Sequence, residues 1–288
     1  MNNLSVLCLA VAGLSACNGS NSKSSETANA SSRSNAAEKP NIVIILTDDQ
    51  GYGDMKCYGN SRLQTPNLDQ LAAEGIRFTN FYAGAAASTP SRAALLTGRY
   101  AERAGLQGVV DDMSVNGLES DEFTLADYLK QNNYATGIFG KWHLGCLPEH
   151  LPLRHGFNEF FGLPYSNDMW PFHPQPGHPY RALPLYDNER VVEYNPTVNH
   201  MTTRITERAT AFIDKHKNEP FLLYVPYTQP HVPLGVSDKF KGKSGEGLYA
   251  DVIMEIDWSV GEIMKTLKEN GLDDHTLVLF TSDNGPWL

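Results

Sequence analysis

The sequence has few cysteines, no excess of positive charge and no long hydrophobic run. Four cysteines in 288 residues (Cys8, Cys17, Cys57 and Cys146) are too few for a disulfide scaffold and lack the spacing of a zinc ribbon. The 23 Lys and Arg against 33 Asp and Glu give a net charge of −10, which argues against nonspecific nucleic-acid binding, since that function needs a basic face. No apolar run approaches the ~20 residues of a membrane-spanning helix.

The composition and length of the chain are typical of a folded globular protein. Hydrophobic residues make up 41% of the chain and charged residues 19%, which is ordinary for a globular protein with a packed core. The length favours one large domain or two small ones.

The first 39 residues differ from the rest in composition. A short apolar run, 4–14, leads into Leu14-Ser15-Ala16-Cys17, which resembles the lipobox of bacterial lipoproteins. This predicts a signal peptide over 1–16 and a lipid anchor on Cys17, hence an exported protein in the bacterial periplasm or anchored to a membrane. The alternative is an ordinary secretory segment with a chance cysteine. Residues 17–39, rich in Ser and Asn, predict a flexible tether.

The remainder predicts an α/β fold with a mostly parallel central sheet. Continuous β-branched and apolar runs predict buried strands at 41–47, 135–139, 221–225 and 276–281. Helical patterns lie between them at 65–72, 124–132, 200–216 and 248–269. The run 276–281 is apolar on both faces, which suits a central strand. Residues 164–196, rich in Pro, His, Tyr and Trp, predict a long irregular excursion beside a binding cleft. Whether Cys57 and Cys146 pair in an oxidising compartment stays open.

Polar residues follow each predicted strand. Asp48-Asp49 follows the first strand, Lys141 and His143 the second, His231 the third, and Asp283-Asn284 the fourth. Because the carboxyl ends of parallel strands meet at one edge of a sheet, these residues should converge there. Each motif by itself has an ordinary structural explanation as a helix cap, a turn or a loop, but four of them at equivalent strand ends favour a functional site.

The predicted site combines a hard cation with positive side chains. Asp48, Asp49, Asp283 and Asn284 offer only oxygen ligands, which suit Ca²⁺, or Mg²⁺ as the alternative, rather than zinc. The cationic residues near these ligands in the predicted site are Arg92, Lys141, His143 and His231. A divalent cation with Arg, Lys and His suits an oxyanion such as sulfate or phosphate.

The segment Ser88-Thr89-Pro90-Ser91-Arg92 distinguishes between these oxyanions. By itself it indicates a nucleophile at a helix start, where the helix dipole favours anions, or merely a capped helix. With Leu96-Thr97-Gly98 it resembles the maturation signature of the type I, formylglycine-dependent sulfatases. The resemblance covers 40–288 and includes Asp48-Asp49-Gln50-Gly51-Tyr52-Gly53-Asp54, Gly140-Lys141-Trp142-His143 and Ser282-Asp283-Asn284-Gly285.

The resemblance implies a sulfuric ester hydrolase with the alkaline phosphatase/sulfatase-like fold. A sulfatase-maturating enzyme would oxidise Ser88 to 3-oxoalanine (Cα-formylglycine), and one oxygen of the hydrated aldehyde would attack sulfur. Ser88 would join the four oxygen ligands around Ca²⁺. Arg92 would stabilise the diol, Lys141 and His231 would hold the sulfate, and His143 would help to regenerate the aldehyde, with His231 as the proton donor to the leaving oxygen.

The resemblance also implies that more of the family domain lies beyond residue 288. Such sulfatases carry a second active-site lysine after the Asp-Asn pair and then a C-terminal subdomain, both absent from this chain. Residues 40–288 are therefore expected to be an incomplete N-terminal catalytic domain. The expected substrate is an aryl or carbohydrate sulfate. The alternatives are a phosphatase or phosphonate hydrolase of the same superfamily, or an inactive, lipid-anchored binder of sulfated glycans.

Overall fold

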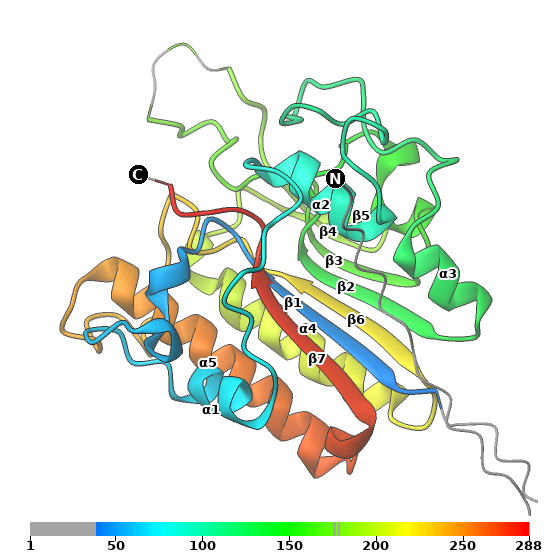
Figure 1. Ribbon diagram of the computed structural model, residues 1–288. Helices are drawn as coiled ribbons and strands as arrows, with labels where there is room; N and C mark the ends of the chain where they lie inside the picture. Colours follow the sequence, from blue (N-terminus) through cyan, green and yellow to red (C-terminus); the bar gives the residue numbers. More distant parts are fainter. Residues whose placement is uncertain (1–38, 175–176, 178, 288) are drawn as a thin grey trace, which may run out of the picture. The chain divides into compact units, whose positions relative to one another are not determined.

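The computed structural model describes residues 39–174, 177 and 179–287 (Figure 1). The chain divides into two units, Met1–Glu38 and Lys39–Leu288, and the fold below is that of the second. The predicted signal peptide, Cys17 and all of the tether except Lys39 lie outside the described residues and stay predictions. Within the described ranges, no helix has the length and apolar character needed to cross a membrane.

A seven-stranded sheet, in the order β5-β4-β3-β2-β6-β1-β7, forms the centre of this unit. The five neighbouring strands β3, β2, β6, β1 and β7 are parallel, whereas β4 and β5 are antiparallel additions at one edge. The strands are β1 Asn41–Thr47, β2 Ala135–Lys141, β3 Glu159–Leu163, β4 Pro184–Asp187, β5 Arg190–Tyr194, β6 Phe221–Pro226 and β7 Thr276–Ser282. The mostly parallel α/β sheet expected from the sequence is therefore confirmed.

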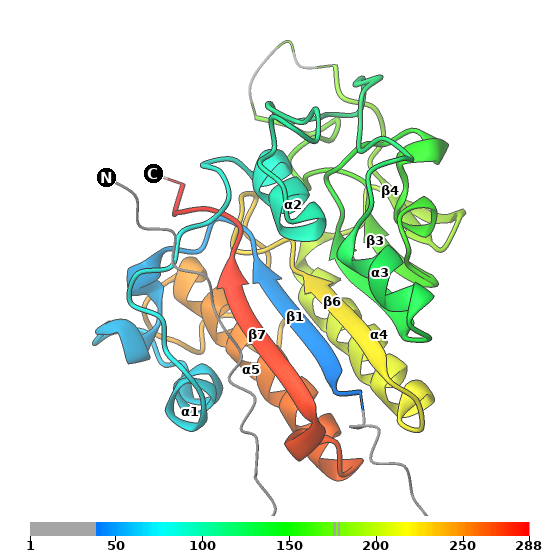
Figure 2. The ribbon, with the colours of Figure 1, turned by 45° about the vertical axis from the view of Figure 1, so that its right-hand side comes forward.

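Helices cover both faces of the sheet, because alternate residues of the strands point to opposite sides (Figure 2). On one side, Val43 and Ile45 join a core with α1, α4 and α5. On the other, Ile44 and Leu46 join a core with α2 and α3. The helices are α1 Pro66–Glu74, α2 Ser88–Thr97, α3 Leu125–Gln131, α4 Met201–His216 and α5 Leu248–Glu269.

The excursion after residue 163 is only partly irregular. Residues 184–194 form the hairpin of β4 and β5, so the prediction of an irregular segment over 164–196 was wrong for that part. The hairpin was missed because Val191, Val192 and Tyr194 are exposed and alternate poorly with polar residues. Cys57 and Cys146, whose pairing the sequence left open, are both free.

Strand β7 borders the sheet formed by the described residues, and its predicted central position in a larger sheet stays a prediction. Its neighbour is β1, with Leu277 opposite Ile42 and Leu279 opposite Ile44. On the face shared with α2 and α3, the side chains of Leu277 and Leu279 are 51% and 41% exposed. The apolar pattern of 276–281 indicates that both faces of this strand can be buried, but it does not show the order of the strands in the sheet.

Glycine at position 140 allows β2 to approach β6 closely just before Lys141. Gly140 has a φ of +140°, and a Cβ there would lie 1.8 Å from the carbonyl oxygen of Pro226. No side chain larger than hydrogen fits without moving the backbone of β6. This close approach therefore sets the position of Lys141, the last residue of β2.

We expect Gly140→Ala to destabilise the protein by about 3 kcal/mol, because it adds a steric overlap to an unfavourable φ. In a domain of this size the loss corresponds to a fall in Tm of roughly 10 °C. Gly108→Ala is the matched control, since a Cβ there meets no atom within 4 Å. Thermal unfolding of the two variants measures the difference, and equal Tm values would contradict the close approach.

Candidate active site

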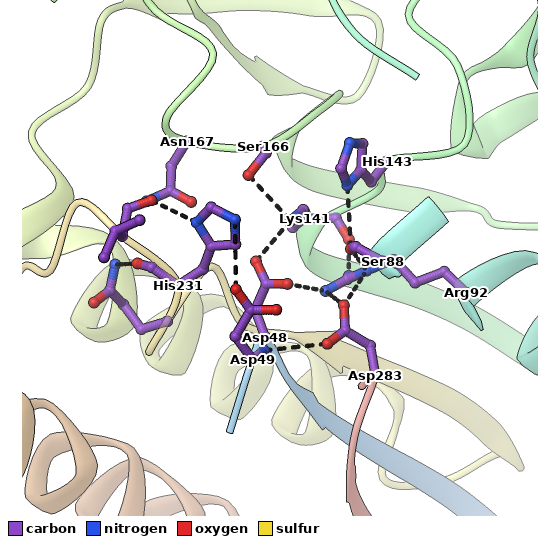
Figure 3. Close-up of polar contacts among 12 residues, drawn as sticks. Asp48, Asp49, Ser88, Arg92, Lys141, His143, Ser166, Asn167, His231 and Asp283 are labelled. Atoms are coloured by element: carbon purple, nitrogen blue, oxygen red, sulfur yellow. Dashed lines mark hydrogen bonds and ion pairs between the residues drawn. The ribbon is translucent and has the colours of Figure 1, made fainter. Parts of the chain in front are cut away.

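The carboxyl ends of β1, β2 and β7 meet the start of α2 in one buried cluster (Figure 3). Asp48 follows β1 directly, Lys141 is the last residue of β2, and Asp283 follows β7 directly. Ser88 is the first residue of α2 and is 7% exposed. Four segments far apart in the sequence thus place ionisable and nucleophilic side chains together.

The guanidinium of Arg92 lies at the centre of this cluster and is fully buried. Its Nε donates to Ser88 Oγ at 2.8 Å, and its Nη2 donates to Asp283 Oδ2 at 2.9 Å and to Asp48 Oδ1 at 3.3 Å. Its Nη1 donates to the Lys141 carbonyl at 2.8 Å. Burial alone would lower the pKa of Arg92, but the carboxylates of Asp283 and Asp48 raise it above its usual value. Arg92 is therefore permanently charged and holds the Ser88 oxygen in place.

Asp48 pairs with both buried cations. Besides Arg92, it contacts Lys141 Nζ at 2.7 Å, and that ammonium also donates to Ser166 Oγ at 3.1 Å. Burial raises the pKa of Asp48, but Lys141 and Arg92 outweigh it and leave the pKa below its usual value. For Asp283, burial and the charge of Asp48 raise the pKa against the opposing effect of Arg92. With Asp49 beside them, the cluster holds three carboxylates against two cations.

Asp49 and Asn284 complete a set of oxygen atoms that fits a cation. Oxygens of Asp48, Asp49 and Asp283 lie within 4.8 Å of one another. Asp49 has a φ of 63°, and this left-handed turn allows consecutive aspartates to face one site. Asn284 Nδ2 donates to Asp49 Oδ1 at 2.5 Å, while Asp49 Oδ2 and Asn284 Oδ1 are buried without a hydrogen-bond partner. Unpartnered buried oxygens beside excess negative charge fit a hard divalent ion.

His143 is oriented as a proton acceptor toward Ser88. Its Nε2 lies 2.9 Å from the Val110 carbonyl, which can only accept, so Nε2 carries the proton and Nδ1 is free to accept. Nδ1 lies 3.1 Å from Ser88 Oγ. Burial, followed by the charges of Lys141 and Arg92, lowers the pKa of His143 well below its usual value. The ring is therefore a neutral base.

His231 approaches the cluster from the opposite side, on the loop after β6 (Figure 3). Its Nδ1 lies 2.5 Å from the Val232 carbonyl and so acts as the donor there, which leaves Nε2 facing Asp49 Oδ2 at 3.6 Å. The ring of Trp287 contacts the imidazole at 5.1 Å and 90°. One reactive nitrogen of His231 is thereby aimed at the group of oxygens.

The structure brings all nine predicted site residues into this one cluster; their chemical roles stay predictions. Sequence reasoning missed Ser166 and Asn167, which lie beside Lys141 and His231 (Figure 3). The excursion after residue 163 was expected to line a cleft, but no motif marked these two residues within it. No local pattern could have predicted them, because they reach the site only through the position of β3, which ends at Leu163 just before them.

Comparisons with known proteins found a matching family model and similar proteins. The family model described as "Sulfatase" matches residues 40–288. Bovine arylsulfatase A is 44% identical over 268 residues, covering 87% of this chain and 53% of the relative. An N-acetylgalactosamine-6-O-sulfatase of Bacteroides thetaiotaomicron is 36% identical, covering 87% of this chain and 60% of the relative.

A solved structure is also similar to this chain in fold. The crystal structure of Ps i-CgsB in complex with k-i-k-neocarrahexaose superposes with a TM-score of 0.76 at 35% identity, covering 86% of this chain and 59% of that chain. The chain thus spans about half the length of the curated relatives it matches.

The buried ion pairs predict a strong effect of removing one partner. In Asp48→Asn, Lys141 keeps only Ser166 as a partner, so we expect a loss of about 3 kcal/mol, typical of an uncompensated buried charge. Asp48→Asn combined with Lys141→Met should recover part of this loss because no lone charge remains. Urea unfolding measures both, with the exposed Asp238→Asn as the control. An unchanged stability in Asp48→Asn would contradict the pairing.

Proposed function

The chain belongs to the sulfatase family, and from this premise we propose that it hydrolyses sulfate esters at the cluster around Ser88. The observation that carries the proposal is the environment of Ser88 Oγ. It lies at a helix start, held by Arg92 and His143, and Arg92 joins it to the carboxylates of Asp48 and Asp283. A nucleophile between cations and a set of hard oxygen ligands suits attack on an anionic ester.

The oxygen set would hold Ca²⁺, with Mg²⁺ as the alternative. Asp48, Asp49, Asp283 and Asn284 supply only oxygen, and modified Ser88 would supply one more ligand. A bound cation would polarise the sulfate and stabilise the negative charge that develops on it. Three carboxylates against Arg92 and Lys141 leave one negative charge, so a divalent ion makes the site positive by one, which matches a sulfate monoester.

Ser88 is proposed as the residue that a sulfatase-maturating enzyme oxidises to formylglycine. An unmodified serine hydroxyl is a weak nucleophile, and the family signature around Ser88 supports the modification. Arg92 would hold the attacking oxygen through its Nε. His143, a neutral base with Nδ1 toward Ser88, would accept a proton from the same residue when sulfate is released.

Lys141 and His231 would act on the substrate. Lys141 Nζ, now shared between Asp48 and Ser166, would hold sulfate oxygens. His231 Nε2 would donate the proton to the leaving oxygen, since Nδ1 is engaged with the Val232 carbonyl. Ser88 and His231 lie on opposite sides of Asp48 and Asp49, as an in-line displacement from the attacking oxygen to the leaving oxygen requires (Figure 3).

A sulfated carbohydrate is the proposed substrate class. Its support comes from relatives: one is an N-acetylgalactosamine-6-O-sulfatase and one structure holds neocarrahexaose. Residues 164–174 would line the leaving-group side, and Phe172 in this segment is 68% exposed. Export to the periplasm, with a lipid anchor at Cys17, is part of the same proposal and rests on the sequence alone.

The rival chemistry is phosphate or phosphonate ester hydrolysis by the same superfamily. It would be supported by faster turnover of 4-nitrophenyl phosphate or a phosphonate monoester than of 4-nitrophenyl sulfate. An inactive binder of sulfated glycans would retain affinity for the glycan without turnover of any ester. Assaying these substrates side by side separates the three possibilities.

Co-expression with a sulfatase-maturating enzyme should leave Ser88 two hydrogens lighter, because oxidation converts its hydroxymethyl group to an aldehyde. Peptide mass spectrometry measures this, and Ser91 in the same peptide is the internal control. Ser88→Ala should lose at least about 1,000-fold of arylsulfate turnover, as expected when the nucleophile is removed. Full activity with an intact serine would rule out the modification.

Calcium should stabilise the protein. At a concentration about 100-fold above Kd, a ligand that binds only the folded state adds roughly 2.7 kcal/mol, or a Tm increase of several degrees. Asp49→Ala removes a ligand whose second oxygen has no hydrogen-bond partner, so the increase should disappear. The exposed Asp238→Ala should retain it. Preferential stabilisation by Zn²⁺ would contradict the hard-cation assignment.

A further inference from the structure

The loop that carries His231 is organised by the side chain of Gln229. This amide is fully buried at the point where the chain leaves β6. Its Nε2 donates to the carbonyls of His231 at 3.2 Å and Pro233 at 3.1 Å. Its Oε1 accepts from the Gly235 amide at 3.1 Å. Every hydrogen bond of the Gln229 side chain is therefore made inside the loop.

The loop needs such a partner because it cannot organise its own backbone. Residues 227–235 form neither helix nor strand. Pro230 and Pro233 have no N–H to donate, so the loop has fewer amides to pair with its buried carbonyls. The Gln229 amide takes the place of the missing backbone partners.

The main chain of Gln229 connects the loop to the metal-binding end of β1. Its carbonyl accepts from the Asp48 amide at 3.1 Å, just beyond the bond from Tyr227 N to the Leu46 carbonyl at 2.8 Å. The residue thus bonds through its backbone to Asp48 and through its side chain to His231. A side-chain substitution removes the second link and leaves the first in place.

We propose that Gln229 is a positioning residue for His231, whose Nε2 it holds beside the oxygen cluster, 3.6 Å from Asp49 Oδ2. This rests on the proposed function, in which His231 protonates the leaving oxygen. Gln229 itself does not touch the substrate. Asn167 adds weaker contacts at 3.5 Å to the Val232 and Pro233 carbonyls, so the amide of Gln229 is the main support from within the loop.

The expected effect depends on the leaving group. General acid catalysis contributes about 100- to 10,000-fold, and a displacement of about 1 Å can cost about 100-fold. A poor leaving group needs the proton, whereas 4-nitrophenolate leaves without much help. Misplacing His231 should therefore slow phenyl sulfate much more than 4-nitrophenyl sulfate.

The test compares Gln229→Met and His231→Ala with the unchanged chain, all co-expressed with a sulfatase-maturating enzyme. Methionine keeps the length of the side chain but makes none of its three hydrogen bonds. We expect kcat/KM to fall about 100-fold for phenyl sulfate and less than about threefold for 4-nitrophenyl sulfate. The stabilisation by Ca²⁺ should be unchanged, since the bond from Asp48 to the main chain at residue 229 remains.

Asn41→Leu is the matched control. Asn41 is also a buried amide, which bonds to Phe221 N at 3.2 Å and Thr276 Oγ1 at 3.3 Å at the opposite end of β1. It should lower Tm as Gln229→Met does, yet slow both substrates equally. A residue with a merely structural role moves Tm without changing the ratio of the two substrates.

Hydrogen exchange tests the loop without requiring turnover. In Gln229→Met the peptide spanning 229–236 should exchange at least about tenfold faster, because the Gly235 amide loses its acceptor. Asn41→Leu should leave this peptide unchanged. Unchanged exchange in Gln229→Met overturns the inference. The inference is also overturned if His231→Ala slows phenyl sulfate much more than 4-nitrophenyl sulfate but Gln229→Met slows both equally. If both variants slow the two substrates equally, the proton-donor role of His231 is overturned instead.

Discussion

The buried guanidinium of Arg92 is the constraint on which the site depends. A charge without access to water is tolerated only where opposite charges and acceptors surround it. Here those partners come from β1, β2 and β7, while Arg92 itself is on α2. Pairing this one residue therefore requires the three strands to end at the same level and α2 to begin directly beside them. The same contact presents Ser88, one turn earlier on α2, to the carboxylates.

The site has two halves that are held by different physical means. Around Arg92 and Lys141, full charges in contact determine the arrangement, and their strength in a dry environment makes it rigid. In the half that carries His231, the imidazole makes a longer approach to charge, with Nε2 at 3.6 Å from Asp49 Oδ2. Neutral hydrogen bonds from Gln229 and the β6–β1 pairing support it. A substitution can consequently displace His231 while leaving Ser88 and the carboxylates around Arg92 in place.

The backbone is strained where the chemistry requires consecutive side chains to face one point. Asp49 and His143 both have a φ of 63°, a conformation that costs a residue with a Cβ about 1–3 kcal/mol. Each is the second residue after a buried strand and turns the chain there. The dense hydrogen bonds around Arg92 help to offset this cost.

The sequence by itself determined the elements whose signals are local. The buried runs of β1 and β7 and the amphipathic pattern of α5 predicted their positions to within a residue, and the polar residues after each strand predicted the members of the site. Only the tertiary structure decided that β7 pairs with β1, that β4 and β5 extend the sheet, and that Ser166 and Gln229 support Lys141 and His231. Strand order and hydrogen-bond partners depend on residues far apart in the chain, and no pattern of hydrophobicity along the sequence records such contacts.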